Sequence, residues 1–226
     1  MSYRQPRFTR PPGATELLLI RHGESRAADP ANPFPLVDGQ GDPELHDAGR
    51  AQAEAVALRL RELPLRALYA TKLRRTQETA APTAAALGLP IAVDPDLHEV
   101  HLGAWEGGLF RKKVADLDPV YLEMQRQQRW DVIPGGESPE ALDARLDRAL
   151  ARLHAAHPDA MIAAFVHGGV IAHLLHRASG SQRFAFTGAE NGSLSQLLLT
   201  PEGIKVRSFN DVSHLLHLEA GDGRMT

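Results

Sequence analysis

The segment LLLIRHGES, residues 17–25, joins four aliphatic residues directly to an arginine, a histidine and a glycine. A short, uninterrupted aliphatic run is typical of a strand that is buried on both faces of a sheet. In open α/β sheets, ligands bind beyond the carboxyl ends of the strands. The segment therefore predicts a buried strand that places Arg21 and His22 where a ligand binds.

Strand and helix patterns alternate along the rest of the chain. We expect strands at Glu16–Ile20, Leu65–Ala70, Ile91–Asp94 and Met161–Val166, and helices over residues 53–60, 74–87, from Pro139 onward and over 170–176. The runs LSQLLL and IKVRSF flank a Thr200–Gly203 turn and predict an antiparallel hairpin. This order predicts an α/β fold with three layers, α/β/α, and a mostly parallel central sheet with an antiparallel edge.

The length of the chain favours one domain. Its 226 residues, 43% of them hydrophobic, suffice for one sizeable core, and no Gly/Ser/Pro linker divides them. We expect residues 1–14 to form a flexible basic leader and residues 218–226 to form a flexible tail. Residues 15–217 would then form a single α/β domain with a helical insertion at about 108–136.

Composition excludes several classes of protein. The chain has no cysteine, which removes disulfide frameworks, thiol nucleophiles and cysteine-based zinc sites and fits a reducing compartment. A formal net charge of −3 argues against a general nucleic-acid binder. No apolar run approaches the ~18 residues that cross a membrane. We therefore expect a cytoplasmic protein that binds neither nucleic acid nor membranes.

A second strand ends in the same way as the first. Val166 is followed by His167, Gly168 and Gly169. Glycines let a ligand approach the backbone and leave N–H groups for an anion, so the two histidines could meet in one anion-binding pocket. A single histidine after a strand is more often a cap or a satisfied polar residue, so neither segment is decisive alone.

The segment TKLRRTQETA, residues 71–80, follows a predicted strand with an arginine pair. Arg74 and Arg75 stand at the start of a helix, where the backbone already favours anions. A guanidinium fork adds bidentate recognition of phosphate. Taken alone, such a pair is more often a solvated surface feature.

The segment DLHEVHLGAWEG, residues 96–107, carries a carboxyl group close to a tryptophan. Glu99 beside Trp105 could have a raised pKa and act as a general acid. His98 and His101 are three residues apart, but no third ligand of suitable spacing accompanies them. We therefore expect no metal site here.

Together, the blocks RHGES, LRRTQETA, HEVHLGAWEG and VHGG resemble, in this order, the signatures of the histidine phosphatase superfamily, also called the phosphoglycerate mutase-like fold. Residues 39–53 are similar to a further block, and the resemblance spans about Glu16 to Phe209. The sequence departs from the pattern at Ala28, where many members carry Asn, and at His46, where Thr is common.

The resemblance implies three catalytic residues, His22, Glu99 and His167. It also implies a substrate site made of Arg21, Gly23, Ser25, Arg75 and Gly168. His22 would take the phosphoryl group and become a phosphohistidine. Arg21 and Arg75 would hold the phosphate oxygens, and His167 would stabilise the same charge. Glu99 would protonate the leaving alcohol and then help to activate water. Two guanidinium groups suit this task, so no metal or other cofactor is expected.

Three functions remain open from the sequence. The first is a phosphatase that hydrolyses a small phosphorylated metabolite, which the Gly-x-Trp-Glu-Gly loop favours because it looks like the phosphatase branch. The second is a cofactor-dependent phosphoglycerate mutase, an isomerase, for which Arg111–Lys113 and residues 125–131 could supply positive charge. The third is an inactive binding protein, although such members typically lose the residues present here. The hairpin edge is a candidate surface for a homodimer.

Overall fold

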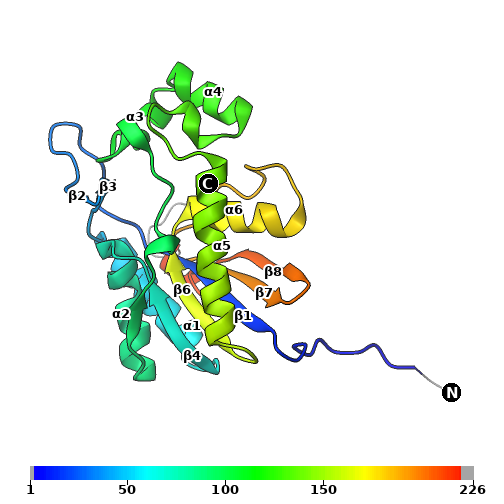
Figure 1. Cartoon of the computed structure of the whole chain (residues 1–226). Helices are drawn as coiled ribbons and strands as arrows, with labels where there is room; N and C mark the ends of the chain where they lie inside the picture. The colour runs from blue at the N-terminus through cyan, green and yellow to red at the C-terminus, as the bar shows by residue number, and fades with distance from the viewer. Residues whose placement is uncertain (1–2, 220–226) are drawn as a thin grey trace.

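The central sheet has the predicted mixture of parallel and antiparallel strands. The computed structural model describes residues 3–219 and contains a six-stranded sheet with the order β5-β4-β6-β1-β7-β8 (Figure 1). The strands are β1 (Thr15–Arg21), β4 (Leu65–Ala70), β5 (Ile91–Val93), β6 (Met161–Val166), β7 (Leu194–Thr200) and β8 (Gly203–Asp211). β5, β4, β6 and β1 pair in parallel, whereas β7 is antiparallel to both β1 and β8. The predicted mostly parallel sheet with an antiparallel edge is therefore confirmed.

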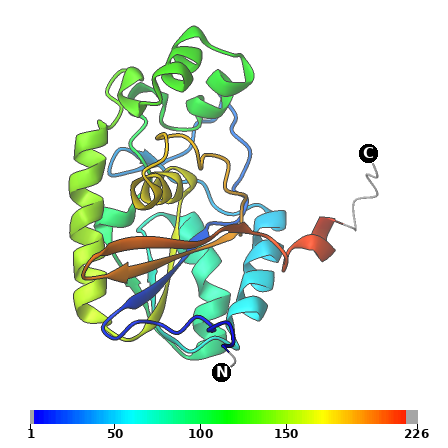
Figure 2. The same cartoon turned by 90° about the vertical axis from the view of Figure 1, so that its right-hand side faces the viewer.

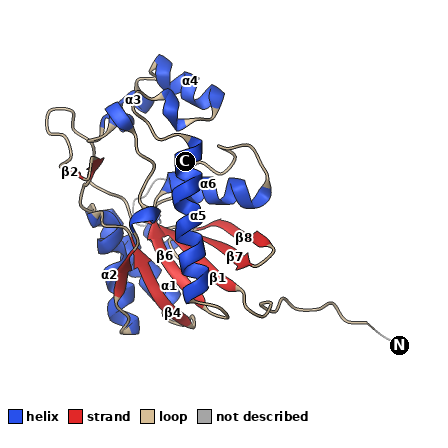
Figure 3. Ribbon diagram, viewed as in Figure 1, coloured by secondary structure: helices blue, strands red, loops and turns tan. Residues whose placement is uncertain are grey.

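Helices cover both faces of the sheet. The helices α1 (Asp47–Leu60) and α2 (Arg74–Leu87) pack on one face, and α5 (Pro139–Ala156) and α6 (Gly168–Ser179) pack on the other (Figure 2). The colouring of Figure 3 shows the strands enclosed between these helices. This is the predicted three-layer α/β/α arrangement.

The aliphatic run in β1 contributes to the hydrophobic cores on both faces of the sheet. Leu17 and Leu19 pack with α5 and α6, while Leu18 and Ile20 pack with α1 and α2. Successive side chains of a strand point to opposite faces, so a strand between two helical layers must be apolar at every position. The strand continues through Arg21, one residue beyond the predicted end.

The predicted insertion forms a helical cap above the carboxyl ends of the strands (Figure 1). It contains α3 (Leu109–Ala115), α4 (Pro119–Gln127) and a 3₁₀ turn at Trp130–Val132. Met124 and Ile133 are buried with Trp105 in a small core of its own. The aromatic rings of Phe110, Tyr121, Trp130 and Phe184 pack around this core.

Helix starts show which local signals were sufficient. Ser138 caps α5, because its Oγ accepts the Ala141 N–H at 3.1 Å, as its sequence predicts. His46 caps α1, because its Nδ1 accepts the Ala48 N–H at 3.4 Å; Thr is common at this position in the family that the sequence resembles. α2 has no side-chain cap of its own; the Asp42 carboxylate, from a distant loop, accepts the Arg74 N–H at 2.7 Å.

A few elements differ from the prediction. β5 ends at Val93, because Asp94 instead caps a 3₁₀ turn (Pro95–Leu97) and forms an ion pair with Arg152. The short hairpin of β2 (Leu36–Val37) and β3 (Gln40–Gly41) and the helix α7 (Leu216–Glu219) had no clear sequence signal.

The N-terminal segment contacts the domain near the start of β1. Arg10 donates to the Asp159 carbonyl oxygen at 2.5 Å, and the Gly13 N–H donates to the Asp159 carboxylate at 2.6 Å. The flexibility of this leader stays a prediction. The predicted tail lies outside the described residues from 220 onward. Within residues 3–219, no helix is long and apolar enough to cross a membrane.

Candidate active site

Three adjacent parallel strands bring the conspicuous residues together. His22 follows β1, His167 follows β6, and Arg75 lies in the first turn of α2 after β4. Because these strands are neighbours and parallel, their carboxyl ends share one edge of the sheet. Glu99 reaches the same edge from the loop after β5, since its carboxylate contacts the start of α6. The predicted site residues therefore converge.

The tautomer of His22 follows from its contacts. Its Nδ1 lies 2.8 Å from the Gly23 carbonyl oxygen, which can only accept, so Nδ1 carries the proton. The other nitrogen, Nε2, accepts a hydrogen bond of 3.3 Å from Arg75 Nε. Burial, together with the charges of Arg75 and Arg21, holds the pKa of His22 well below its ordinary value. The ring is therefore neutral, with its Nε2 lone pair directed toward the arginine.

His167 and Arg21 each keep a buried nitrogen without a hydrogen-bond partner among the described residues. The His167 ring lies 5.2 Å from the His22 ring, its Nε2 is 3.2 Å from Thr71 Oγ1, and its Nδ1 is unpaired. Arg21 donates from Nη1 to the Ala189 carbonyl, whereas its Nε is unpaired. Buried polar atoms are rarely left unpaired, so these two nitrogens are candidates for hydrogen bonds to a bound anion.

Arg75, and not Arg74, is the arginine that enters the site. Arg75 is buried and donates from Nη1 to the Gly41 carbonyl at 2.7 Å. Burial lowers the pKa of Arg75 to about 10, which still leaves it charged at neutral pH. Arg74 is exposed and pairs with Glu44 and Glu78.

The Glu99 carboxyl group lies at the start of α6. Its Oε1 accepts the Val100 N–H at 2.9 Å, and its Oε2 accepts the Gly169 N–H at 3.3 Å. Burial raises the pKa of Glu99, and this effect outweighs the opposing hydrogen bond from Val100 and charge of Arg75. A raised pKa brings a carboxylic acid closer to the range in which it can donate a proton at neutral pH.

The remaining predicted residues support the site in different ways. The Gly23 N–H donates to Thr79 Oγ1 at 2.9 Å and so is not free for an anion; a Cβ at Gly23 would lie 2.4 Å from the Gly49 carbonyl oxygen. The structure therefore gives Gly23 a packing role against α1. Gly168 begins α6, where a Cβ would come within 3.3 Å of Arg21 Nε. Ser25 Oγ accepts from Arg111 Nη2 at 2.6 Å.

Sequence reasoning missed Asn191 and understated Arg111. Asn191 Nδ2 donates to the His22 carbonyl at 2.8 Å from a loop before β7, and no local pattern marks it. The sequence marked Arg111 only as part of the basic segment Arg111–Lys113, yet its guanidinium contacts Ser25 and lies 5.3 Å from the centre of the Phe34 ring. Both residues reach the site from segments far along the chain.

Two cavities open beside His22. One, of about 230 Å³, is lined by the charged side chains of Arg21, Arg75, Glu99, Glu106 and Arg111 and by the apolar side chains of Phe34, Val100, Leu102, Trp105, Phe110 and Trp130. The other, of about 630 Å³, is lined mainly by polar and small residues that include Arg21, Ser25, Lys112 and Asn191. Arg111 lines both cavities. The Glu99 carboxyl group therefore faces the cavity that contains the aromatic side chains.

The two histidines near Glu99 make local contacts. His98 Nδ1 lies 2.9 Å from the Glu99 carbonyl, and His101 Nδ1 accepts the Gly103 N–H at 3.1 Å. Across residues 3–219, no group of three or more His, Asp or Glu side chains is arranged to hold a metal ion.

Comparison with known proteins agrees with this geometry. Two curated relatives from Arabidopsis thaliana match most of the chain. Phosphoglycerate mutase-like protein 4 is 36% identical over 204 residues, covering 88% of this chain and 86% of that protein. A metal-independent phosphoserine phosphatase is 32% identical over 206 residues, covering 89% and 83%.

Solved structures of related proteins have the same fold. A mycobacterial glucosyl-3-phosphoglycerate phosphatase superposes with a TM-score of 0.72 at 29% identity, covering 87% of this chain and 99% of that one. A phosphoglycerate mutase from Bacillus anthracis, at 19% identity and a TM-score of 0.76, shares the fold. Residues 17–212, which hold every strand-end residue described above, match the model of the histidine phosphatase superfamily (branch 1). The chain therefore belongs to that superfamily and is a phosphatase enzyme.

Proposed function

We propose that this protein hydrolyses a small phosphomonoester through a phosphohistidine formed on Nε2 of His22. The observation that carries the proposal is the state of His22, whose ring is buried and neutral and has its proton on Nδ1. The guanidinium groups of Arg21 and Arg75 and the ring of His167 surround it. Phosphoryl transfer depends mainly on positioning and on neutralising spread negative charge, so these groups suit the task without a metal ion.

In the first step, the Nε2 lone pair of His22 attacks the phosphorus atom. A P–N bond forms, and the ester P–O bond to the alcohol breaks. Glu99 gives its proton to the leaving oxygen, so that a neutral alcohol departs. Arg21 and Arg75 hold the equatorial oxygens and keep the negative charge spread over them.

In the second step, water hydrolyses the phosphohistidine. The Glu99 carboxylate, now deprotonated, takes a proton from the water as its oxygen attacks phosphorus. The P–N bond breaks, inorganic phosphate leaves, and His22 returns to its neutral form. The covalent intermediate divides one difficult hydrolysis into two easier displacements.

The aromatic side chains of the cavity that Glu99 lines support a proposal on the substrate. The leaving oxygen must lie within reach of Glu99, so the alcohol part of the substrate occupies the cavity that Glu99 lines. The walls of that cavity include Trp105, Phe110 and Trp130. Aromatic walls bind apolar groups and flat ring faces better than small hydrated chains. We therefore propose a phosphorylated metabolite with a ring or another apolar face next to its phosphate.

The experiment that tests the proposal follows phosphate release by the purified protein and by His22→Ala. We expect turnover of 4-nitrophenyl phosphate by the wild type in the presence of a strong chelator, and none by the variant. Rapid quenching of the wild type should trap an acid-labile, alkali-stable phosphoenzyme. Unchanged turnover by His22→Ala would exclude the proposed nucleophile, and loss of activity with chelator would exclude the metal-free reaction.

A phosphoglycerate mutase is the second candidate, and the similarity to phosphoglycerate mutase-like protein 4 supports it. Interconversion of phosphoglycerate isomers after priming with the bisphosphate decides between the two. Efficient interconversion would replace hydrolysis as the main reaction.

The cytoplasmic location and a homodimer through the edge of β8 stay predictions. Light scattering of the purified protein measures its oligomeric state.

A further inference from the structure

Arg145 is a buried arginine in a helix whose neighbouring arginines are exposed. Its side chain is 6% exposed, whereas those of Arg148 and Arg152, also on α5, are 59% and 47% exposed. Burying a guanidinium is costly unless its donors are satisfied, so its contacts must be specific.

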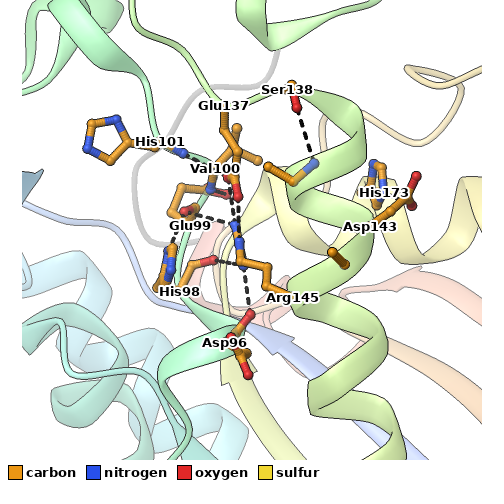
Figure 4. Close-up of polar contacts among 12 residues, drawn as sticks. Asp96, His98, Glu99, Val100, His101, Glu137, Ser138, Asp143, Arg145 and His173 are labelled. Atoms are coloured by element: carbon orange, nitrogen blue, oxygen red, sulfur yellow. Dashed lines mark hydrogen bonds and ion pairs between the residues drawn. The ribbon is translucent and has the colours of Figure 1, made fainter.

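Every N–H of Arg145 has an acceptor, as Figure 4 shows in part. Nη1 donates to the carbonyl oxygens of Asp96 at 2.7 Å and His98 at 2.8 Å. Nη2 donates to the carbonyl oxygen of Glu99 at 3.2 Å and to Glu137 Oε2 at 2.9 Å. Nε donates to Glu137 Oε1 at 2.7 Å. A guanidinium has five N–H groups, and here all five are used.

Three of these acceptors are backbone carbonyls within residues 96–99. Only the beginning of this stretch has regular structure, a single 3₁₀ turn that ends at Leu97. Three carbonyls directed at one cation fix the path of the backbone up to Glu99 itself. The Glu99 carbonyl also receives a hydrogen bond of 2.6 Å from Gln40 Nε2.

Glu137 extends the same network to the other side of Glu99. Its carboxylate accepts the His101 N–H at 3.2 Å, and its own N–H donates to the His101 carbonyl at 2.9 Å. Burial alone would raise the pKa of Glu137, but the hydrogen bond and charge of Arg145 outweigh burial and hold it below its ordinary value. The ionised pair thus holds the loop by hydrogen bonds to the backbone both before and after Glu99.

The Glu99 carboxyl group depends on this backbone for its position. Within residues 3–219, its oxygens accept hydrogen bonds only from the N–H groups of Val100 and Gly169. We propose that Arg145, paired with Glu137, is a positioning residue that places the Glu99 carboxyl for proton transfer to the leaving oxygen. Arg145 does not line either cavity and acts through the loop. The inference rests on the proposed function, because it takes Glu99 as the acid.

Leaving-group dependence separates this role from a merely structural one. An alkoxide is a poor leaving group and needs a proton, whereas 4-nitrophenolate departs without one. Displacing the acid should therefore slow an alkyl phosphate far more than an aryl phosphate. A general loss of folded or well-packed enzyme would slow both equally. The ratio kcat/KM reports the steps up to alcohol release, so hydrolysis of the phosphohistidine does not enter.

The decisive variant is Arg145→Lys, which keeps the positive charge but cannot reach all the acceptors that a planar fork reaches. We expect its kcat/KM to fall by about 30-fold or more for butyl phosphate and by less than about threefold for 4-nitrophenyl phosphate. Arg148→Lys is the matched control, since Arg148 lies one turn away, is exposed and pairs with the Asp96 carboxylate. In this control, kcat/KM for both substrates should stay within about twofold of the wild-type value.

A second variant guards against a failure of folding. Glu137→Gln keeps the size of the side chain and leaves Arg145 in place, but it removes the negative charge that pairs with Arg145 and that accepts the His101 N–H. We expect the same selectivity for the alkyl phosphate, with a smaller loss, and an unchanged circular dichroism spectrum. If Arg145→Lys does not fold, Glu137→Gln decides alone. Proportional losses on both substrates, or full alkyl activity in a folded variant, would overturn the inference.

Glu99→Gln distinguishes the two levels of the proposal. It should show the selective loss most strongly, because it removes the acid itself. If Glu99→Gln lowers kcat/KM equally for both substrates, Glu99 is not the acid, and the proposed function fails at that step. If Glu99→Gln slows the alkyl phosphate selectively but Arg145→Lys and Glu137→Gln do not, only the positioning role of Arg145 is wrong.

Discussion

Arg75 Nε donates to His22 Nε2 across 3.3 Å, on the side of the ring opposite the Gly23 carbonyl. The same guanidinium helps to keep the imidazole neutral, since its charge adds to burial in lowering the pKa of His22. In the proposed reaction, this arginine would hold the nucleophile before substrate binds and the phosphate afterwards. One side chain thereby orients both reacting partners.

Arg75→Lys tests this double role. A lysine keeps the charge but has no fork to contact the ring, the phosphate and the Gly41 carbonyl together. We expect kcat/KM for 4-nitrophenyl phosphate to fall by about 100-fold, as when one preorganised donor is lost. Arg74→Lys, at the exposed neighbouring position, should stay within about twofold. Equal effects of the two substitutions would contradict the assignment.

The pH profile should reflect opposite pKa shifts. Burial and nearby arginines hold the pKa of His22 well below its ordinary value of 6.5, so the proposed nucleophile stays neutral below pH 6.5. Burial raises the pKa of Glu99, so the proposed acid loses its proton only as pH rises through that raised value. We expect kcat/KM for butyl phosphate to persist into mildly acidic buffer and to decline on the alkaline side. The alkaline decline should disappear in Glu99→Gln.

Stability should reveal the cost of burying Glu99. The folded pKa of Glu99 is raised, so its contribution is present below the unfolded pKa and is lost as pH rises through the folded pKa. Above that range, wild type holds a buried carboxylate, whereas Glu99→Gln does not. We expect the Tm of Glu99→Gln, relative to wild type, to increase from acidic to alkaline pH. A constant Tm difference across this range would show that the carboxyl titrates normally.

Gly23→Ala should destabilise the fold through a clash between backbones. Its Cβ would lie 2.4 Å from the Gly49 carbonyl oxygen in α1, so the strand end or the helix must move. We expect a loss of about 1–3 kcal/mol in the free energy of unfolding, measured by urea titration. Gly168→Ala is the comparison, because its Cβ would meet only the Arg21 side chain, at 3.3 Å. Gly168→Ala should therefore cost less stability.

Trp130→Ala tests the proposed substrate face. Trp130 lines the cavity that holds Glu99, and its ring packs 5.0 Å from Phe184 and 5.9 Å from Phe110. We expect KM for 2-naphthyl phosphate to rise by about tenfold, with a smaller change for glycerol 2-phosphate. Tyr121→Ala is the control, since Tyr121 packs in the same aromatic core without lining the cavity. Equal changes in KM for both substrates would show that the aromatic side chains of this cavity do not select the substrate.

Local patterns in the chain were sufficient for the framework. The run of residues 17–20 required a strand buried on both faces, and the predicted helix at 74–87 has the observed limits of α2. The sequence also predicted that His22, His167 and Arg75 lie at the same edge, because each follows the carboxyl end of a parallel strand; the order that makes these strands neighbours was not predicted. Periodicity and chain direction are properties of the sequence itself, so these features needed no coordinates.

Tertiary structure alone decided how the chemistry is held. Arg145 meets the Glu99 carbonyl across 46 residues, and Asn191 meets the His22 carbonyl across 169 residues. In the sequence, Arg145 looks like any arginine of an amphipathic helix, and Gly23 looks like a phosphate-loop glycine. Only packing buries Arg145 against three carbonyls and brings α1 against Gly23. Hydrogen-bond partners and close contacts depend on where distant segments meet, which no local pattern in this chain encodes.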